Sequence, residues 1–193
     1  MNRVLCILCC VFVFSLTACN EPEKNNEPEK DVEVVIEGLG AGPEFLEGIW
    51  TANRGGWKFV FEKDGSIGGV IHSMGRSILR PGQITRVPLK KGGEGYYEPG
   101  KWRIVYDSNL RELTVEIELK SFKAQIEKNI VEGNSTDIFV GPISIDGKQW
   151  DAQWYSYPEY YVTIGEYDHH KLPVDPNNNP KGVLIFSKQD KPK

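Results

Sequence analysis

Apolar and polar side chains alternate through much of the chain, and this two-residue period is typical of β-strands that bury one face. The clearest case is the stretch 113–119, where four aliphatic residues alternate with one threonine and two glutamates. Three further stretches follow the same rule with aromatic side chains: residues 57–61, 102–106 and 150–154. Residues 183–186 form a last, fully apolar strand, and no long segment has a helical period, which leaves room only for a short helix near Pro81 or Tyr160.

Turn-forming dipeptides separate these stretches, as expected where strands form hairpins. Three of them are Asp64-Gly65, Ser108-Asn109 and Asp146-Gly147. After residues 113–119 the apolar positions Phe122, Ala124 and Ile126 continue with the opposite parity. The pattern therefore predicts a bulge or bend near Lys120-Ser121.

This order of elements predicts an all-β domain, an antiparallel meander of about eight to ten strands. A meander of this size either closes into a barrel or folds into a sandwich. Closure removes the exposed strand edges, so we expect a closed or nearly closed barrel, with a β-sandwich as the alternative.

Residues 47–50 (Glu-Gly-Ile-Trp), followed by Phe59, Phe61 and the hairpin Asp64-Gly65-Ser66-Ile67, resemble the opening of lipocalin-like proteins. In that family a Gly-x-Trp starts the first barrel strand, and its tryptophan plugs the closed end of the barrel. The resemblance implies a lipocalin-like (calycin-type) domain over residues 45–190, with Trp50 as the plug. The last strand offers Lys188 where that family has an arginine packed on the tryptophan.

The first eighteen residues have the composition of an export signal. Arg3 gives a positive start, and the apolar run Val4–Leu16 would make a helix of roughly 20 Å, too short for the ~30 Å core of a bilayer. Leu16-Thr17-Ala18-Cys19 resembles the lipobox of bacterial lipoproteins. The resemblance implies cleavage of residues 1–18 and attachment of lipid to Cys19, and the alternative is an ordinary secretory signal.

The segment after the signal is predicted to be a lipid anchor and flexible tether over residues 19–44. Residues 21–30 (EPEKNNEPEK) hold no large apolar side chain, so they cannot bury enough surface to offset the entropy of ordering. The apolar stretch Val32–Ile36 is either a first edge strand or part of the tether. Asn20 favours the outer membrane, because the lipoprotein sorting pattern uses aspartate at that position for retention in the inner membrane.

Cysteine and charge content fit an exported domain without nucleic acid as a partner. The four cysteines are Cys6, Cys9, Cys10 and Cys19. All lie in or at the end of the signal, so the mature domain has no disulfide. The chain has 23 basic and 27 acidic residues, and removal of Arg3 with the signal leaves 22 against 27, a net charge of −5. No basic patch stands out, which argues against nucleic-acid binding.

Aromatic residues are the main candidates for a binding site. The tryptophans are candidates for plugging the barrel or lining a ligand site: Trp50, Trp57, Trp102, Trp150 and Trp154. A second set surrounds Pro158 and could stack on a partner at the surface: Tyr155, Tyr157, Tyr160 and Tyr161. Ordinary core packing is the competing interpretation for the tryptophans, and strand ends with solvated hydroxyls for the tyrosines.

Metal and catalytic chemistry have little support in the sequence. Asp168-His169-His170 with Asp175 resembles a ligand cluster, but adjacent histidines on an extended strand point opposite ways, so we predict no metal and no cofactor. His72 is the remaining histidine, and no serine lies in a recognisable nucleophile setting.

The sequence therefore predicts a membrane-anchored binding module for a small apolar or amphipathic ligand. The alternatives are an interaction protein of the cell envelope with a filled core and a protein partner, and, third, a hydrolase.

Overall fold

The chain is nearly all β. The computed structural model describes residues 31–40, 42–90, 92–126, 129–164, 168–175 and 177–189. One short 3-10 helix, η1, spans Pro43–Leu46. The strands within the described ranges are β1 (Val32–Glu37), β2 (Gly48–Ala52), β3 (Lys58–Phe61), β4 (Ile67–Ile71), β5 (Ile78–Leu79), β6 (Thr85–Pro88), β7 (Glu94–Asp107), β8 (Glu112–Ile126), β9 (Asn129–Pro142), β10 (Gln149–Ile164), β11 (Asp168–Lys171) and β12 (Gly182–Lys188).

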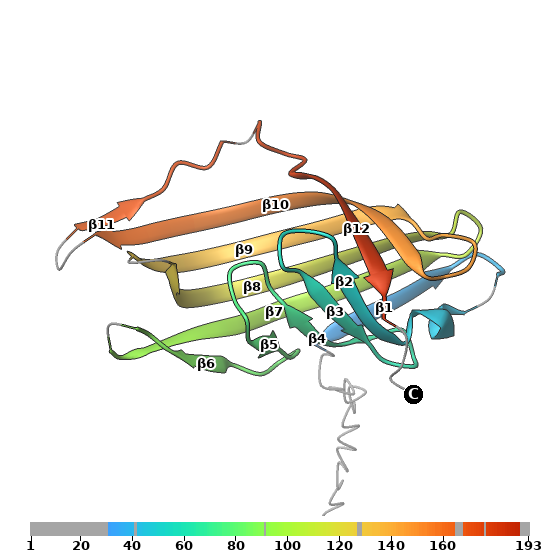
Figure 1. Cartoon of the computed structure of the whole chain (residues 1–193), viewed down its shortest axis with the longest axis horizontal. Coiled ribbons are helices and arrows are strands. Elements are labelled where there is room, and N and C mark those ends of the chain that lie inside the picture. Colours follow the sequence, from blue (N-terminus) through green and yellow to red (C-terminus); the bar gives the residue numbers. More distant parts are fainter. Residues whose placement is uncertain are drawn as a thin grey trace, which may run out of the picture.

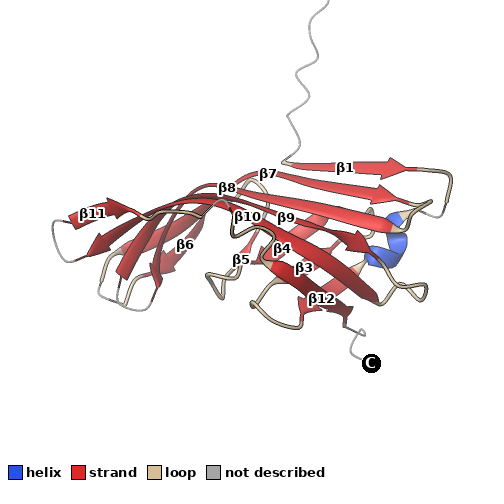
Figure 2. Cartoon of the chain, turned by 90° about the horizontal axis from the view of Figure 1, so that it is seen from above, coloured by secondary structure: helices blue, strands red, loops and turns tan. Residues whose placement is uncertain are grey.

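These strands form one strongly curled sheet (Figure 1). Its main order is β1-β7-β8-β9-β10-β12-β2-β3-β4-β5, with β6 on β7 and β11 on β10. The long strands β7–β10 lie side by side, and β2–β5 fold over one part of them while β6 and β11 extend the other part (Figures 1 and 2). The all-β prediction is confirmed, and one continuous sheet takes the place of the two packed sheets of a sandwich.

The sheet is an open half-barrel because its two end strands do not pair with each other. The last strand, β12, pairs with β2, as closure of an up-and-down barrel requires. Between β5 and β7 the ring is open, and β1 occupies that edge of β7 in parallel orientation, with Val32 opposite Trp102 and Glu37 opposite Asp107. The alternation of apolar residues does not predict this parallel pairing, because β1 precedes the antiparallel meander in the sequence.

The predicted turns and the predicted bend are confirmed. Hairpins follow Phe61, Asp107 and Pro142, at the three dipeptides expected from the sequence. The pairing of β8 with β9 shifts between Leu119 and Phe122, and that of β7 with β8 shifts at Pro99. These irregularities let both halves of β8 turn their apolar side chains to the same concave face.

The barrel part of the concave face is filled by aromatic rings. Trp57, Phe59, Phe139, Trp150 and Phe186 have no exposed surface. The rings of Trp150 and Phe186 stack at 4.8 Å, and Phe59 lies edge-on to Phe139 at 5.3 Å. Edge-to-face and offset contacts are the preferred aromatic geometries, so this interior is a packed core.

The N-terminal part of the sheet differs from the expected arrangement. Of the two alternatives for the stretch at residue 32, the structure has the edge strand, so the sheet begins before the boundary expected at residue 45. Tyr160 lies in β10 and Pro81 in the turn after β5, and the short helix is η1 instead. Residues 1–30 lie outside the described part of the chain, and with them the expected signal and Cys19.

Candidate functional site

A groove of about 540 Å³ lies on the concave face, beyond the aromatic core. The loop after β4 forms one wall and β6 with the following loop the other, while β7 and β8 contribute Tyr97 and Ala124. We call it the concave-face groove. Its lining is Ser73, Met74, Gly75, Arg76, Ser77, Val87, Pro88, Leu89, Lys90, Tyr97, Ala124 and Gln125.

The lining combines an apolar surface with positive charge. Arg76 and Lys90 are exposed, and the lining residues that the structure describes include no aspartate or glutamate, although the whole chain has a net charge of −4. The Tyr97 phenol is neutral at physiological pH and adds no negative charge, and burial raises its pKa further above its ordinary value. The groove therefore favours a ligand with an apolar part and an anionic part.

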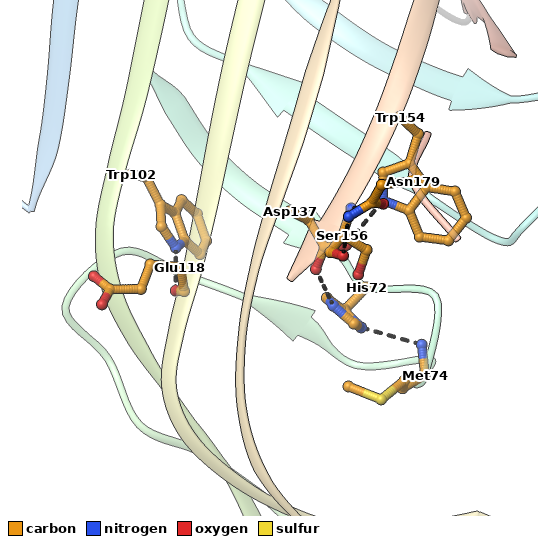
Figure 3. Close-up of polar contacts among 8 residues, drawn as sticks. All are labelled: His72, Met74, Trp102, Glu118, Asp137, Trp154, Ser156 and Asn179. Atoms are coloured by element: carbon orange, nitrogen blue, oxygen red, sulfur yellow. Dashed lines mark hydrogen bonds and ion pairs between the residues drawn. The ribbon is translucent and has the colours of Figure 1, made fainter. Parts of the chain in front are cut away.

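A buried polar cluster holds the loop that forms one wall of this groove (Figure 3). His72 follows β4, Asp137 lies on β9 and Trp154 lies on β10. Asp137 accepts hydrogen bonds through both oxygens, from His72 Nε2 at 3.2 Å and from Trp154 Nε1 at 2.8 Å. The Met74 backbone N–H donates to His72 Nδ1 at 3.2 Å, which ties the groove wall to the cluster.

These contacts determine what His72 can do chemically. Nδ1 accepts from a backbone N–H, so the proton of the neutral ring lies on Nε2 and is donated to Asp137. The imidazole is 2% exposed, and the Trp57 ring packs edge-on against it at 4.3 Å. With both nitrogens engaged in hydrogen bonds, the ring positions the loop at Met74.

Asp137 also affects the neighbouring Tyr160. Burial, and after it the negative charge of Asp137, raise the pKa of Tyr160 to about 12. The Tyr160 ring packs edge-on against Phe122 at 5.7 Å. Tyr160 therefore lies on the concave face, between the polar cluster and the apolar surface of β8.

A second, larger groove of about 1200 Å³ lies at the open seam of the half-barrel. It is bordered by Val32–Val34 of β1, by Ile67 of β4 and by outward-facing side chains of β7–β9. Five carboxylates line it against two cations, Lys101 and Arg103, so its charge is opposite in sign to that of the concave-face groove. We call it the seam groove.

The candidate tryptophans lie in or beside the core. Four are fully buried: Trp50, Trp57, Trp102 and Trp150. Trp154 is partly buried beside them. The Trp50 indole donates to Leu46 O at 2.8 Å, and Lys188 lies opposite Trp50 and reaches the Phe45 carbonyl. Trp102 also borders the seam groove, and none of the five lines the concave-face groove.

The candidate tyrosines are divided between the two faces of β10. Tyr155, Tyr157 and Tyr161 have one parity, and Tyr157 is 53% exposed. Tyr160 has the other parity and points to the concave face. Lys171 Nζ lies 5.8 Å from the centre of the Tyr161 ring. The four side chains therefore do not form one surface patch.

No protein-family model, no curated protein and no solved structure matches the chain. Among the residues described, no group of three or more acidic, histidine or cysteine side chains is placed to hold a metal ion. The same residues include no helix that is long and apolar enough to cross a membrane.

The cluster of His72, Asp137 and Trp154 was not anticipated, although its signal is present in the sequence. Asp137 has the parity of Phe139, and His72 has the parity of Val70, so both are expected on inward positions. A charged residue at a buried strand position needs a partner, and that requirement could have linked them. Alternation does not tell which two strands bring them together.

Proposed function

We propose that this chain is a non-enzymatic binding module for a small amphipathic ligand with an anionic group, bound in the concave-face groove. The observation that carries the proposal is the described lining: Met74, Val87 and Leu89 offer apolar surface beside two cations, and the described lining residues include no carboxylate. The volume of about 540 Å³ lies within the usual range of ligand sites. The engaged nitrogens of His72 support binding over hydrolysis.

Calorimetric titration of the purified chain with decanoate tests this proposal, with decyltrimethylammonium as the probe of opposite charge. We expect decanoate to bind more tightly, because the chain lengths are equal and only the sign of the head group differs. Combined R76E and K90E substitutions should weaken decanoate binding about tenfold, since they reverse both charges at the groove. Lys63, an exposed lysine in the β3–β4 turn, provides the matched control K63E.

Equal binding of the two probes, or unchanged decanoate affinity after the double substitution, would contradict the proposal. The alternative is an interaction protein of the envelope with a filled core and no small ligand. The packed aromatic interior of the half-barrel favours that alternative. It predicts that neither probe binds at all.

We further propose that the domain acts at a membrane surface, held through lipid on Cys19, with Asn20 favouring the outer membrane. The support is the sequence pattern of residues 1–20. Several acyl chains, each CH₂ contributing about 0.8 kcal/mol, would make such an anchor stable. Cells labelled with palmitate should yield a labelled chain, the C19S variant should be unlabelled, and an unlabelled wild-type chain would refute the anchor.

A further inference from the structure

The edge of β1 away from β7 borders the seam groove, and no other described strand pairs with it. Asp31 O accepts from Trp102 N at 3.1 Å, and Glu37 O accepts from Ser108 N at 2.9 Å. In a parallel pair the bonds to one neighbour come from every second residue, so the odd-numbered residues of β1 face β7. Val32, Val34 and Ile36 consequently direct their N–H and C=O groups away from the sheet.

The side chains along this edge alternate between the two faces of the sheet. Val32 and Val34 pack against the hydrophobic core on the concave face. Glu33 is on the other face, where its carboxylate contacts Arg103 at 3.1 Å. A strand added beside β1 would therefore place alternate side chains next to apolar and next to acidic surface.

The seam groove supplies the space and the charge for such a strand. It runs along Val32–Val34 and is bordered on the other side by Ile67 of β4, which has no described strand opposite it on the side away from β3. Its lining carries five carboxylates and two cations. The edge strand β1 is drawn at the rim of the sheet in Figure 2, with no strand beyond it.

We propose that β1 binds an extended segment of a partner polypeptide in which basic and apolar residues alternate, by strand addition at the seam groove. Main-chain hydrogen bonds to Val32, Val34 and Ile36 would hold the segment, and its Lys or Arg side chains would lie on the outward face beside the Glu33 carboxylate of the neighbouring strand. This inference concerns a different face from the concave-face groove and does not depend on it.

Two other occupants match the edge less well. A second copy paired through β1 would bring Glu33 and Glu37 against the same acidic residues, and like charges on neighbouring strands repel. The chain's own residues 21–30 contain two prolines and no large apolar side chain to fill the inner positions. The acidic charge of the seam groove and the alternation of side chains along β1 together favour a partner segment in which basic and apolar residues alternate.

Binding of short peptides to the purified chain tests the proposal, with one peptide alternating lysine and valine and a second alternating glutamate and valine. We expect the lysine peptide to bind and the glutamate peptide to bind at least tenfold more weakly. V34P removes a free-edge donor while sparing the bonds to β7, as an edge strand tolerates. It should weaken the lysine peptide at least tenfold relative to the matched variant V34A, and E33Q, on the edge strand itself, should weaken it severalfold.

Hydrogen exchange gives a second readout that needs no variant. The amides of Val32, Val34 and Ile36 should become protected when the lysine peptide binds. Equal affinity of V34P and V34A, binding of both peptides alike, or absence of this protection would overturn the proposal. A wild-type dimer that V34P dissociates would assign the edge to a second copy and would also overturn it.

Discussion

At the scale of single residues, the buried carboxylate of Asp137 connects β9 to β10 and to the loop after β4. It is 2% exposed and is the acceptor for two buried donors, the ring N–H of His72 and the indole N–H of Trp154. A buried donor that loses its acceptor costs about 1–3 kcal/mol. The cluster therefore stabilises the sheet and fixes the loop at Met74 through one carboxylate.

We expect D137A to lower the free energy of unfolding by about 3 kcal/mol, because both donors lose their acceptor. D137N should cost less, since its amide oxygen still accepts one of the two bonds. Urea denaturation measures these changes. The neighbouring T136A variant, on an outward position, should stay within about 0.5 kcal/mol of wild type, and an equally small loss in D137A would contradict this role.

Tyr160 gives a prediction for alkaline pH. Its pKa in the folded chain is raised to about 12, whereas an unfolded tyrosine ionises near 10.0, so the folded chain holds a proton that the unfolded chain has lost. This contribution to stability is complete below pH ~10 and is lost as the pH rises toward ~12. Phenolate absorbance should show a late step that Y160F removes and D137N shifts to lower pH, and an unshifted step would contradict the effect of the Asp137 charge.

At the scale of elements, the alternation of apolar residues predicted the strands well, because each strand of the barrel part buries one face. The parity change after Leu119 correctly located the bulge of β8. In β12 the same rule failed in part: all four of residues 183–186 are apolar, yet only Leu184 and Phe186 are buried. Val183 and Ile185 are apolar but exposed, so residue type alone does not distinguish them from core residues.

Close approach of β9 and β10 at Gly141 is an element-level feature that the sequence did not reveal. A Cβ atom at this position would lie 1.9 Å from the backbone oxygen of Asp151. The carbonyl oxygen of Gly141 also accepts a hydrogen bond from the Trp150 indole N–H at 3.1 Å. Glycine is thus required where the two strands cross closely.

We expect G141A to lower the free energy of unfolding by about 1–3 kcal/mol or more, because backbone must move to admit the methyl group. The adjacent outward position supplies the matched substitution V140A, which removes side-chain atoms without a clash. Thermal or urea unfolding measures both variants. A G141A chain as stable as wild type would show that the strands separate there at no cost.

At the scale of the whole molecule, whether the sheet closes into a barrel is the feature that is hardest to predict from the sequence. Alternation shows which side chains face inward, but it does not show which edges become neighbours. The parallel β1 at the edge of β7 and the open side beyond it arise from this missing information. The two grooves of opposite charge follow from the same opening and curl. Four of the five candidate tryptophans are fully buried, and Trp102 also borders the seam groove.

The central claim is that an anionic amphiphile binds the concave-face groove and not the half-barrel interior. Paramagnetic broadening of amide resonances by a spin-labelled fatty acid, doxyl stearate, locates such a ligand directly. Resonances of Met74, Tyr97 and Ala124 should lose intensity, while those of Trp150 and Phe186 keep theirs. Broadening centred on Trp150 and Phe186, or no broadening of any amide, would contradict the account.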